Sequence, residues 1–412
     1  MSLKLQGAVG KQAFVLLPNP EQCRRVYDLE RSQSLANETA VLARVILPGR
    51  AFEEDPLAEL EGLATTAGCQ VASGLVQRRE SINPATCLGK GKTEELKLLV
   101  DHVGADLVIF DNDLQPAQTR NLEKALGVKV LDRTELILDI FASNAQTHES
   151  RLAVELAQLE YSLPRLKRMW THLSRVKMGV GMRGPGEKQL EVDRRLVEKR
   201  IHDLRTELQQ IERRKERVVR SRRDHMTVSL VGYTNAGKST LMNALTDAQV
   251  VAEDKLFATL DTRTRRWFLP NWGPVLLSDT VGFIRDLPHR LIASFKATLE
   301  EAHQADLLLH VADGSSPAAL DQISAVFNVL EEIEIDTKAT LLIVNKVDLI
   351  ESTATLDAIL NRYPNAIPIS ARNGMGLDSL ARAVSEALSR SFHDVEVVTD
   401  VGNGKLLAYL SA

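Results

Sequence analysis

Two kinds of hydrophobic pattern alternate along the first third of the chain. Short apolar runs that are typical of strands, at residues 11–20, 68–77, 105–114 and 127–130, are separated by stretches of helical length. Such an alternation predicts a small α/β domain over residues 1–145.

The period changes in residues 146–225. Leucines recur three and four residues apart from Leu152 to Leu163, as on one face of a helix, and a near-heptad apolar spacing resumes after Leu190. Pro164 is expected to kink or restart the first helix. Four glycines and Pro185 in residues 177–189 disfavour helix. We therefore expect an antiparallel helical hairpin with a flexible, basic loop at its tip.

From Met226 the pattern becomes that of apolar strands separated by helical lengths. This pattern predicts a mostly parallel sheet covered on both faces, with ligands at the carboxyl ends of its strands, over residues 226–391. Residues 392–412 are expected to form a short remnant, because they are too few for a domain of their own. The expected strands lie in the segments TVSLVG, VLLSDTVG, DLLLHVAD, ATLLIVNKVD and NAIPISA.

Composition narrows the class of protein. The chain has 412 residues, 44% hydrophobic and 26% charged, and no run approaches the ~18 apolar residues of a membrane-spanning helix. The amino terminus lacks the pattern of a secretory signal, and the three cysteines form no CxxC pair. We therefore expect a cytoplasmic protein that associates at most peripherally with ribosomes or a membrane. The net charge of −4 excludes a uniformly basic nucleic-acid binder but not a local basic segment.

The first chemical motif is the segment GYTNAGKS, which follows an apolar strand and opens a helix. This context indicates a phosphate-binding loop, whose glycines turn backbone amides toward phosphate oxygens. Lys238 is expected to bridge the outer phosphates as a catalytic group, and the Ser239 hydroxyl to bind Mg²⁺. The nucleotide-contacting residues of this loop are Gly232, Tyr233, Thr234, Asn235, Ala236, Gly237, Lys238, Ser239 and Thr240.

Further motifs follow in the order typical of GTPases. DTVG places Asp279 where a carboxylate holds Mg²⁺, and Gly282 where its amide meets the terminal phosphate. In NKVD, the Asp348 carboxylate can accept hydrogen bonds from N1 and N2 of guanine, which adenine does not offer, so GTP and GDP are the expected ligands. The residues concerned are Asp279, Thr280, Val281, Gly282, Asn345, Lys346, Val347, Asp348, Ser370, Ala371 and Arg372.

Between the phosphate loop and DTVG lies the segment DKLFATLDTRTRR, which has several hydroxyl groups where a mobile switch is expected. Thr259 is the preferred switch threonine and third Mg²⁺ ligand, with Thr262 and Thr264 as rivals; a solvated, threonine-rich loop is the alternative. The surrounding residues expected to contact nucleotide are Phe257, Ala258, Leu260 and Asp261.

Position 283 is Phe, where many GTPases have the Gln that orients the attacking water. A phenyl ring cannot hydrogen-bond water. Hydrolysis is therefore expected to be slow until a partner completes the site.

Several long segments resemble the HflX family of GTPases. They are GMRGPGEKQLEVDRR from Gly181, FATLDTRTRR from Phe257 and DTVGFIRDLPHRLIASFKATLEEA from Asp279, with CLGKGKTEEL from Cys87 and DNDLQPAQTRNLEKAL from Asp111 also similar. The resemblance covers nearly the whole chain. It implies a cytoplasmic factor that binds the large (50S) ribosomal subunit, separates or rescues stalled ribosomes, and is stimulated by that subunit in GTP hydrolysis.

The same resemblance implies that the hairpin tip contacts ribosomal RNA. Glycines permit close approach to RNA phosphates, and basic side chains neutralise them; a solvated helix end is the alternative. The tip residues concerned are Gly181, Arg183, Gly184, Gly186 and Lys188. Family members generally continue into a small carboxyl-terminal domain, whereas this chain ends at Ala412. Nothing in the sequence demands more than a monomer.

Two functions are compatible with these observations. One is a GTP-driven switch on the large ribosomal subunit. The other is a regulatory nucleotide-binding module whose partner is a different RNA or protein and whose hydrolysis is incidental.

Overall fold

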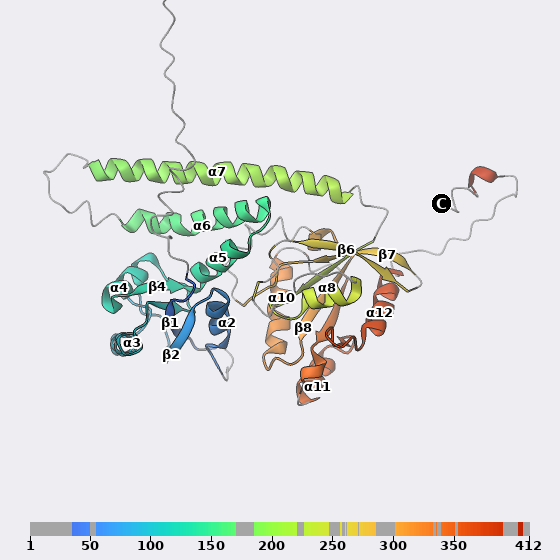
Figure 1. Cartoon of the computed structure of the whole chain (residues 1–412), viewed down its shortest axis with the longest axis horizontal. Coiled ribbons are helices and arrows are strands. Elements are labelled where there is room, and N and C mark those ends of the chain that lie inside the picture. The colour runs from blue at the N-terminus through green and yellow to red at the C-terminus, as the bar shows by residue number, and fades with distance from the viewer. Residues whose placement is uncertain are drawn as a thin grey trace, which may run out of the picture. The chain divides into compact units, whose positions relative to one another are not determined.

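The structure is a computed structural model, and Figure 1 shows its helices and strands. It divides into two compact units, Met1–Arg133 with Leu159–Asp203, and Thr134–Gln158 with Leu204–Ala412. The residues that it describes are 35–49, 55–169, 185–220, 226–246, 256–257, 260, 262–270, 272–285, 301–332, 335, 339–350, 353–389 and 403–406. The apolar run at residues 11–20 lies outside this part of the chain.

The first unit contains a four-stranded parallel sheet in the order β2-β1-β3-β4. Its strands are β1 (Thr39–Ile46), β2 (Gln70–Arg78), β3 (Leu107–Phe110) and β4 (Lys129–Asp132), and its helices are α2 (Ala58–Thr66), α3 (Lys90–Val103) and α4 (Pro116–Leu126). The last three strands coincide with expected runs. β1 was not predicted, although it lies between β2 and β3.

Helix boundaries in this unit follow local chemistry. α4 has Pro116 in its first turn, where a missing amide hydrogen costs nothing, and the Gln115 amide donates to the Gln118 Oε1 at 2.8 Å. The helix ends at Gly127, whose φ of 80° is left-handed and suits a residue without Cβ.

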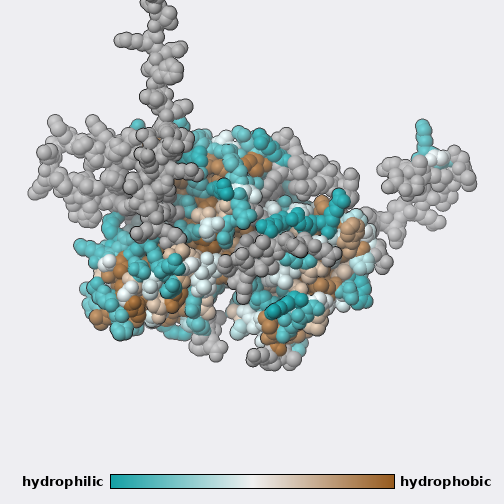
Figure 2. Space-filling model, viewed as in Figure 1, coloured by the Kyte–Doolittle hydropathy of each residue, from teal (hydrophilic) through white to brown (hydrophobic). Residues whose placement is uncertain are grey.

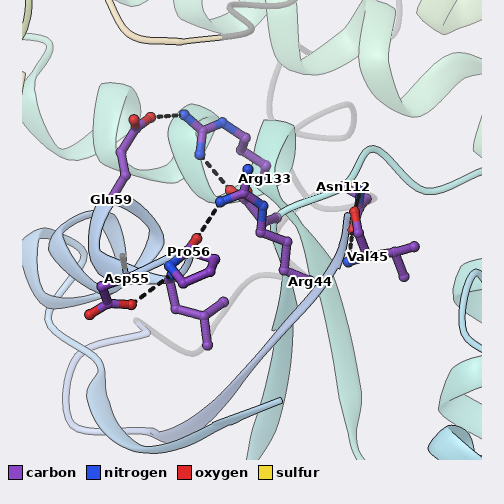
Figure 3. Close-up of polar contacts among 9 residues, drawn as sticks. Arg44, Val45, Asp55, Pro56, Glu59, Asn112 and Arg133 are labelled. Carbon is purple, nitrogen blue, oxygen red and sulfur yellow. Dashed lines mark hydrogen bonds and ion pairs between the residues drawn. The ribbon is translucent and has the colours of Figure 1, made fainter. Parts of the chain in front are cut away.

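Charged side chains form ion pairs at the carboxyl ends of β1 and β3 (Figure 3). The Arg44 Nε lies 3.0 Å from the Asp111 Oδ2, and one terminal nitrogen of Arg133 lies 2.6 Å from the Asp111 Oδ1, while the other meets Glu59. Two guanidinium groups thus face two carboxylates and their charges cancel. Asn112 adds a reciprocal pair of bonds with the Val45 main chain, at 2.7 and 2.9 Å.

Three helices connect the sheets, α5 (Arg133–Asn144), α6 (His148–Met169) and α7 (Pro185–Arg220). In the second unit the His148 Nε2 lies 3.8 Å from the Glu207 Oε1, so the start of α6 lies beside the later part of α7. α6 is a single helix that contains Pro164, without the expected restart.

The expected end of the hairpin loop was wrong. Residues 185–189 belong to α7, which begins at Pro185. Proline is tolerated in the first turn because the amide hydrogens there have no partner within the helix, so Pro185 is compatible with a helix start.

The second unit contains a six-stranded sheet in the order β10-β9-β8-β5-β7-β6, parallel except for β6. Its strands are β5 (Thr227–Gly232), β6 (Arg263–Leu269), β7 (Gly273–Asp279), β8 (Leu307–Asp313), β9 (Thr340–Asn345) and β10 (Ile367–Pro368). Its further helices are α8 (Lys238–Thr246), α10 (Ala319–Glu332), α11 (Thr353–Arg362) and α12 (Leu377–Ser389), with the short η2 (Val347–Leu349). β5 pairs with β7 on one side and with β8 on the other, and the chain after β5 builds first one side of the sheet and then the other. The carboxyl end of β5 is therefore the switch point where such sheets bind ligands.

Hydrophilic and hydrophobic side chains are interspersed on the face seen in Figure 2. The large hydrophobic side chains exposed among the described residues, such as Leu98 and Phe268, come from separate elements. Single exposed apolar residues of this kind are ordinary in folded proteins. Within the same described part of the chain, no helix is long and apolar enough to cross a membrane.

Candidate nucleotide site

The phosphate loop runs from the end of β5 into α8, and two of its glycines are required by space. A Cβ added at Gly232 would lie 2.2 Å from the Val311 carbonyl oxygen, and one added at Gly237 would lie 2.3 Å from the Asn345 Nδ2. Both glycines also have positive φ, 152° and 90°. The loop can therefore sit tightly between the ends of β8 and β9.

Lys238 is buried at the start of α8. Its Nζ donates to the carbonyl oxygens of Gly232 and Tyr233, at 3.0 and 2.8 Å. Burial lowers the pKa of Lys238 to about 8, and the nearby Asp279 partly opposes this by favouring the charged form. A phosphate group would bring further negative charge to this buried ammonium.

Two oxygen donors meet beside the loop. The Ser239 hydroxyl donates to the Asp279 Oδ2 at 2.7 Å, and Asp279 is fully buried at the end of β7. Carboxylate and hydroxyl oxygens are the hard ligands that Mg²⁺ prefers, so the residues present fit that ion.

The segment after β7 pairs with the phosphate loop. The Phe283 amide donates to the Gly232 carbonyl at 3.0 Å, and the Thr234 amide donates to the Phe283 carbonyl at 2.7 Å. A Cβ at Gly282 would lie 3.0 Å from the Lys238 Nζ and 2.8 Å from the Thr234 Cγ2. The Phe283 side chain is buried, so it fills space and offers no polar atom to water.

The base-recognition segment is tied to the phosphate loop through Asn345. Its Nδ2 donates to the Ala236 carbonyl at 2.9 Å, and its Oδ1 accepts from the Ala371 amide at 2.9 Å. One buried side chain therefore joins three of the expected motifs. Asp348 lies in η2 with its side chain exposed to solvent, where a base could reach it.

Asp313 was missed by the sequence reasoning. Its Oδ2 lies 2.7 Å from the Lys346 Nζ, and Lys346 has a positive φ of 62°. The signal available was its position at the carboxyl end of an apolar strand. This ion pair holds the Lys346 side chain beside β8.

The switch segment is described only in part. Thr259, Ala258 and Asp261 lie outside the described residues. Phe257 and Leu260 are buried, 2% and 1% exposed, so the Phe257 side chain packs within the protein and any nucleotide contact by this residue would come from its main chain.

Phe257 contacts helix α5 of the same unit. Its ring meets the Phe141 ring edge to face, with centroids 4.7 Å apart, and its carbonyl accepts a hydrogen bond from the Asn144 Nδ2 at 2.9 Å. Its φ of 56° is left-handed, which costs a bulky residue roughly 1–2 kcal/mol.

Thr264, one of the rival switch threonines, belongs to a strand. It lies in β6, where its hydroxyl is 3.1 Å from the Ser278 hydroxyl and 3.3 Å from the Glu301 Oε2. The expectation of a mobile loop through residue 266 was therefore wrong from Arg263 onward, because the exposed arginines of an edge strand resemble a loop in sequence.

A buried histidine lies behind the phosphate loop. Burial, with a smaller contribution from Lys238, lowers the pKa of His310 to about 3. Its ring meets Phe327 edge to face at 4.9 Å, and its Nδ1 has no hydrogen-bond partner among the described residues. His310 therefore stays neutral in the folded protein at physiological pH.

Three family models match consecutive parts of the chain. Family models described as GTP-binding GTPase N-terminal, GTP-binding GTPase Middle Region and 50S ribosome-binding GTPase match residues 54–142, 144–223 and 227–346. GTPase HflX of Escherichia coli (strain K12) is 48% identical over 357 residues, 86% of this chain and 84% of that protein. The chain belongs to the HflX family of GTPases.

A second HflX protein and a GDP-bound solved structure are also similar to this chain. GTPase HflX of Magnetococcus marinus is 48% identical over 359 residues, 86% of this chain and 83% of that protein. The crystal structure of the SsGBP and GDP complex is 27% identical, with a TM-score of 0.50, and covers 86% of this chain and all of that chain. The expected fold class and the expected HflX-type GTPase are both confirmed.

The HflX-like hairpin tip is mostly outside the described residues. This applies to Gly181, Arg183 and Gly184. Gly186 and Lys188 stand in the first turns of α7, with their side chains not described. Their part in binding a partner stays a prediction.

Proposed function

We propose that this HflX-family GTPase is a Mg²⁺-dependent switch that binds the large ribosomal subunit in its GTP state, separates or rescues stalled ribosomes, and is released on hydrolysis. The observation that carries most weight is the match of the nucleotide-binding half to the family model described as 50S ribosome-binding GTPase. A nucleotide site in which Asn345 joins the loops for phosphate and base supports the switch. We place the protein in the cytoplasm on the same grounds.

A few residues at the phosphate end of the site bind the phosphates and Mg²⁺. Lys238, already buried beside two carbonyl oxygens, gains the phosphates as counter-ions, and its ammonium stabilises charge that develops on the outer phosphate oxygens. Ser239, Asp279 and Thr259 would hold Mg²⁺. The bound ion would supply positive charge that offsets the charge of the phosphates. Gly282 offers its main-chain amide to that phosphate.

The base end selects guanine. The exposed Asp348 carboxylate accepts from guanine N1 and N2, and a mismatched base would leave this carboxylate facing a base without donors. The base also receives a main-chain contact from Ser370, Ala371 and Arg372. The hydrogen bond from the Ala371 amide to the Asn345 Oδ1 supports this contact.

Hydrolysis by the free protein should be slow. The Phe283 side chain is apolar and buried, and its main chain is bonded to the phosphate loop on both sides. Another group must therefore orient the attacking water, and a partner that reorders this segment would accelerate the reaction. We propose that the large subunit is that partner and that the glycine-rich tip of the hairpin contacts its RNA.

Sedimentation with purified large subunits tests this function. We expect pelleting with a non-hydrolysable GTP analogue and at least tenfold less with GDP, together with faster GTP hydrolysis when subunits are added. Equal pelleting in both states would refute the switch, and no pelleting would favour the regulatory module with a different RNA or protein partner. Replacing Gly184 and Gly186 by Ala should weaken pelleting and leave GDP affinity unchanged. Gly91→Ala, where an added Cβ meets nothing within 4 Å, is the matched control.

A further inference from the structure

Phe257 stands in the switch segment but is held by another part of the chain. Its ring packs edge to face on Phe141 at 4.7 Å, and its carbonyl accepts the Asn144 side-chain amide at 2.9 Å. Both partners are on α5, at and near its last residue, and 113 positions separate Asn144 from Phe257 in sequence. Phe257 is therefore held by a long-range contact with a helix that lies outside residues 227–346, the range that the 50S ribosome-binding GTPase model matches.

The backbone at Phe257 argues against simple space filling. A core phenylalanine can be buried from an ordinary strand or helix conformation, whereas this one has a φ of 56°, which bulky residues rarely adopt. Strained conformations persist where the surroundings impose them, and they gather at switches and ligand-binding segments. Here the imposed conformation comes with a side-chain hydrogen bond to the strained residue's own carbonyl.

The contact between Phe257 and α5 lies close in sequence to the expected switch threonine. Phe257 is two residues before Thr259, and Leu260, directly after Thr259, is also buried. Fixing the main chain at Phe257 limits where the next residues can go, since consecutive Cα atoms are only about 3.8 Å apart.

We propose that Phe257, Phe141 and Asn144 form an anchor that positions the switch segment, so that Thr259 is delivered to the nucleotide from a fixed point on α5. The three are positioning residues for GTP hydrolysis, and none of them contacts the reacting atoms through its side chain. The inference rests on the proposed role of Thr259. It adds that the segment leading to Thr259 begins at a residue held by α5.

The first test removes the Asn144 hydrogen bond with Asn144→Ala, with Ser143→Ala, at an exposed position of the same helix, as the control. Loss of one hydrogen bond should reduce single-turnover GTP hydrolysis by about threefold to tenfold and leave GDP affinity within about twofold. Phe257→Gly keeps the left-handed backbone but deletes the ring, and should lower the rate further. Unchanged hydrolysis in Asn144→Ala, or an equal loss of GDP affinity, would overturn the proposal.

A double-mutant cycle shows whether the anchor acts through Thr259. If it does, Asn144→Ala should change the rate by less than about twofold when Thr259→Ala is already present. Full additivity of the two losses would refute the coupling.

Hydrogen exchange tests the anchor without relying on activity. In the nucleotide-free protein, Asn144→Ala should speed exchange in a peptide spanning residues 256–262, while Ser143→Ala should not. This result would support the anchor even if wild-type protein failed to hydrolyse GTP, which would refute the proposed function alone. Unchanged exchange in both variants would mean that Asn144 does not hold the segment.

Discussion

Acid sensitivity of the second unit should depend on His310. The pKa of this histidine falls from its ordinary 6.5 to about 3 on folding, so between these values the unfolded chain binds a proton that the folded protein does not. Stability is therefore lost as the pH falls below 6.5 and regained as it rises. Between pH 7 and pH 5 the loss from this one group is about 2 kcal/mol.

His310→Leu removes the titrating group and should remove that part of the pH dependence. Phe327→Leu is the matched control, because it loosens the same ring contact and keeps the imidazole. We would measure urea unfolding at pH 7 and pH 5 by tryptophan fluorescence in a Trp170→Phe background, where Trp267 and Trp272 remain, both in the second unit.

The quantity compared is the change in unfolding free energy between the two pH values. It should be about 2 kcal/mol smaller in His310→Leu than in wild type and unchanged in Phe327→Leu, whatever each substitution does at pH 7. Equal pH dependence in wild type and His310→Leu would refute the reasoning, because it would show that His310 accepts a proton in the folded protein.

Three further substitutions follow from the contacts described above. Asp111→Ala should lower the unfolding free energy of the first unit by about 3–5 kcal/mol in urea, because two buried guanidinium groups lose their shared carboxylate. The control Asp101→Asn, in an exposed ion pair, should cost no more than about 1 kcal/mol. Similar losses in the two variants would contradict the buried network. Gly237→Ala should abolish binding of a fluorescent GDP analogue, because the added Cβ would clash with the Asn345 side chain, while the circular dichroism spectrum stays that of the wild type. Retained affinity would show that the phosphate loop can shift to accommodate the methyl group. Asp348→Asn should weaken GDP binding at least tenfold and favour xanthosine diphosphate, whose base offers an acceptor in place of the exocyclic amine; unchanged base preference would move recognition elsewhere.

The nucleotide half could be predicted from sequence because its signals are local. GxxxxGKS, DTVG and NKVD each follow an apolar strand, and parallel strands bring their carboxyl ends to one edge. The geometry of Gly237 against Asn345 could not be read in this way, since it depends on residues 108 positions apart in the numbering that meet only after the sheet has formed.

The elements missed share a different cause. β1 carries Arg44 within an apolar run, and an arginine there is tolerated because Asp111, directly after β3, pairs with it. β6 carries exposed arginines because it is an edge strand, so its charge suggested a loop. Pro185 suggested a helix breaker where it is the first residue of a helix. In each case the local residue types did not reveal the position of the residue in the folded sheet or helix, and that position determines its conformation.

The division of the chain into two units has a consequence for synthesis. Each unit is made of two separate stretches, so the chain passes between them at residues 133/134, 158/159 and 203/204. During translation the first unit cannot be completed until residue 203 has been made, and residues 134–158 must wait for the rest of their own unit. A fragment that begins at Met226 would carry every nucleotide motif but lack Phe141 and Asn144, leaving Phe257 without the surface on which it packs.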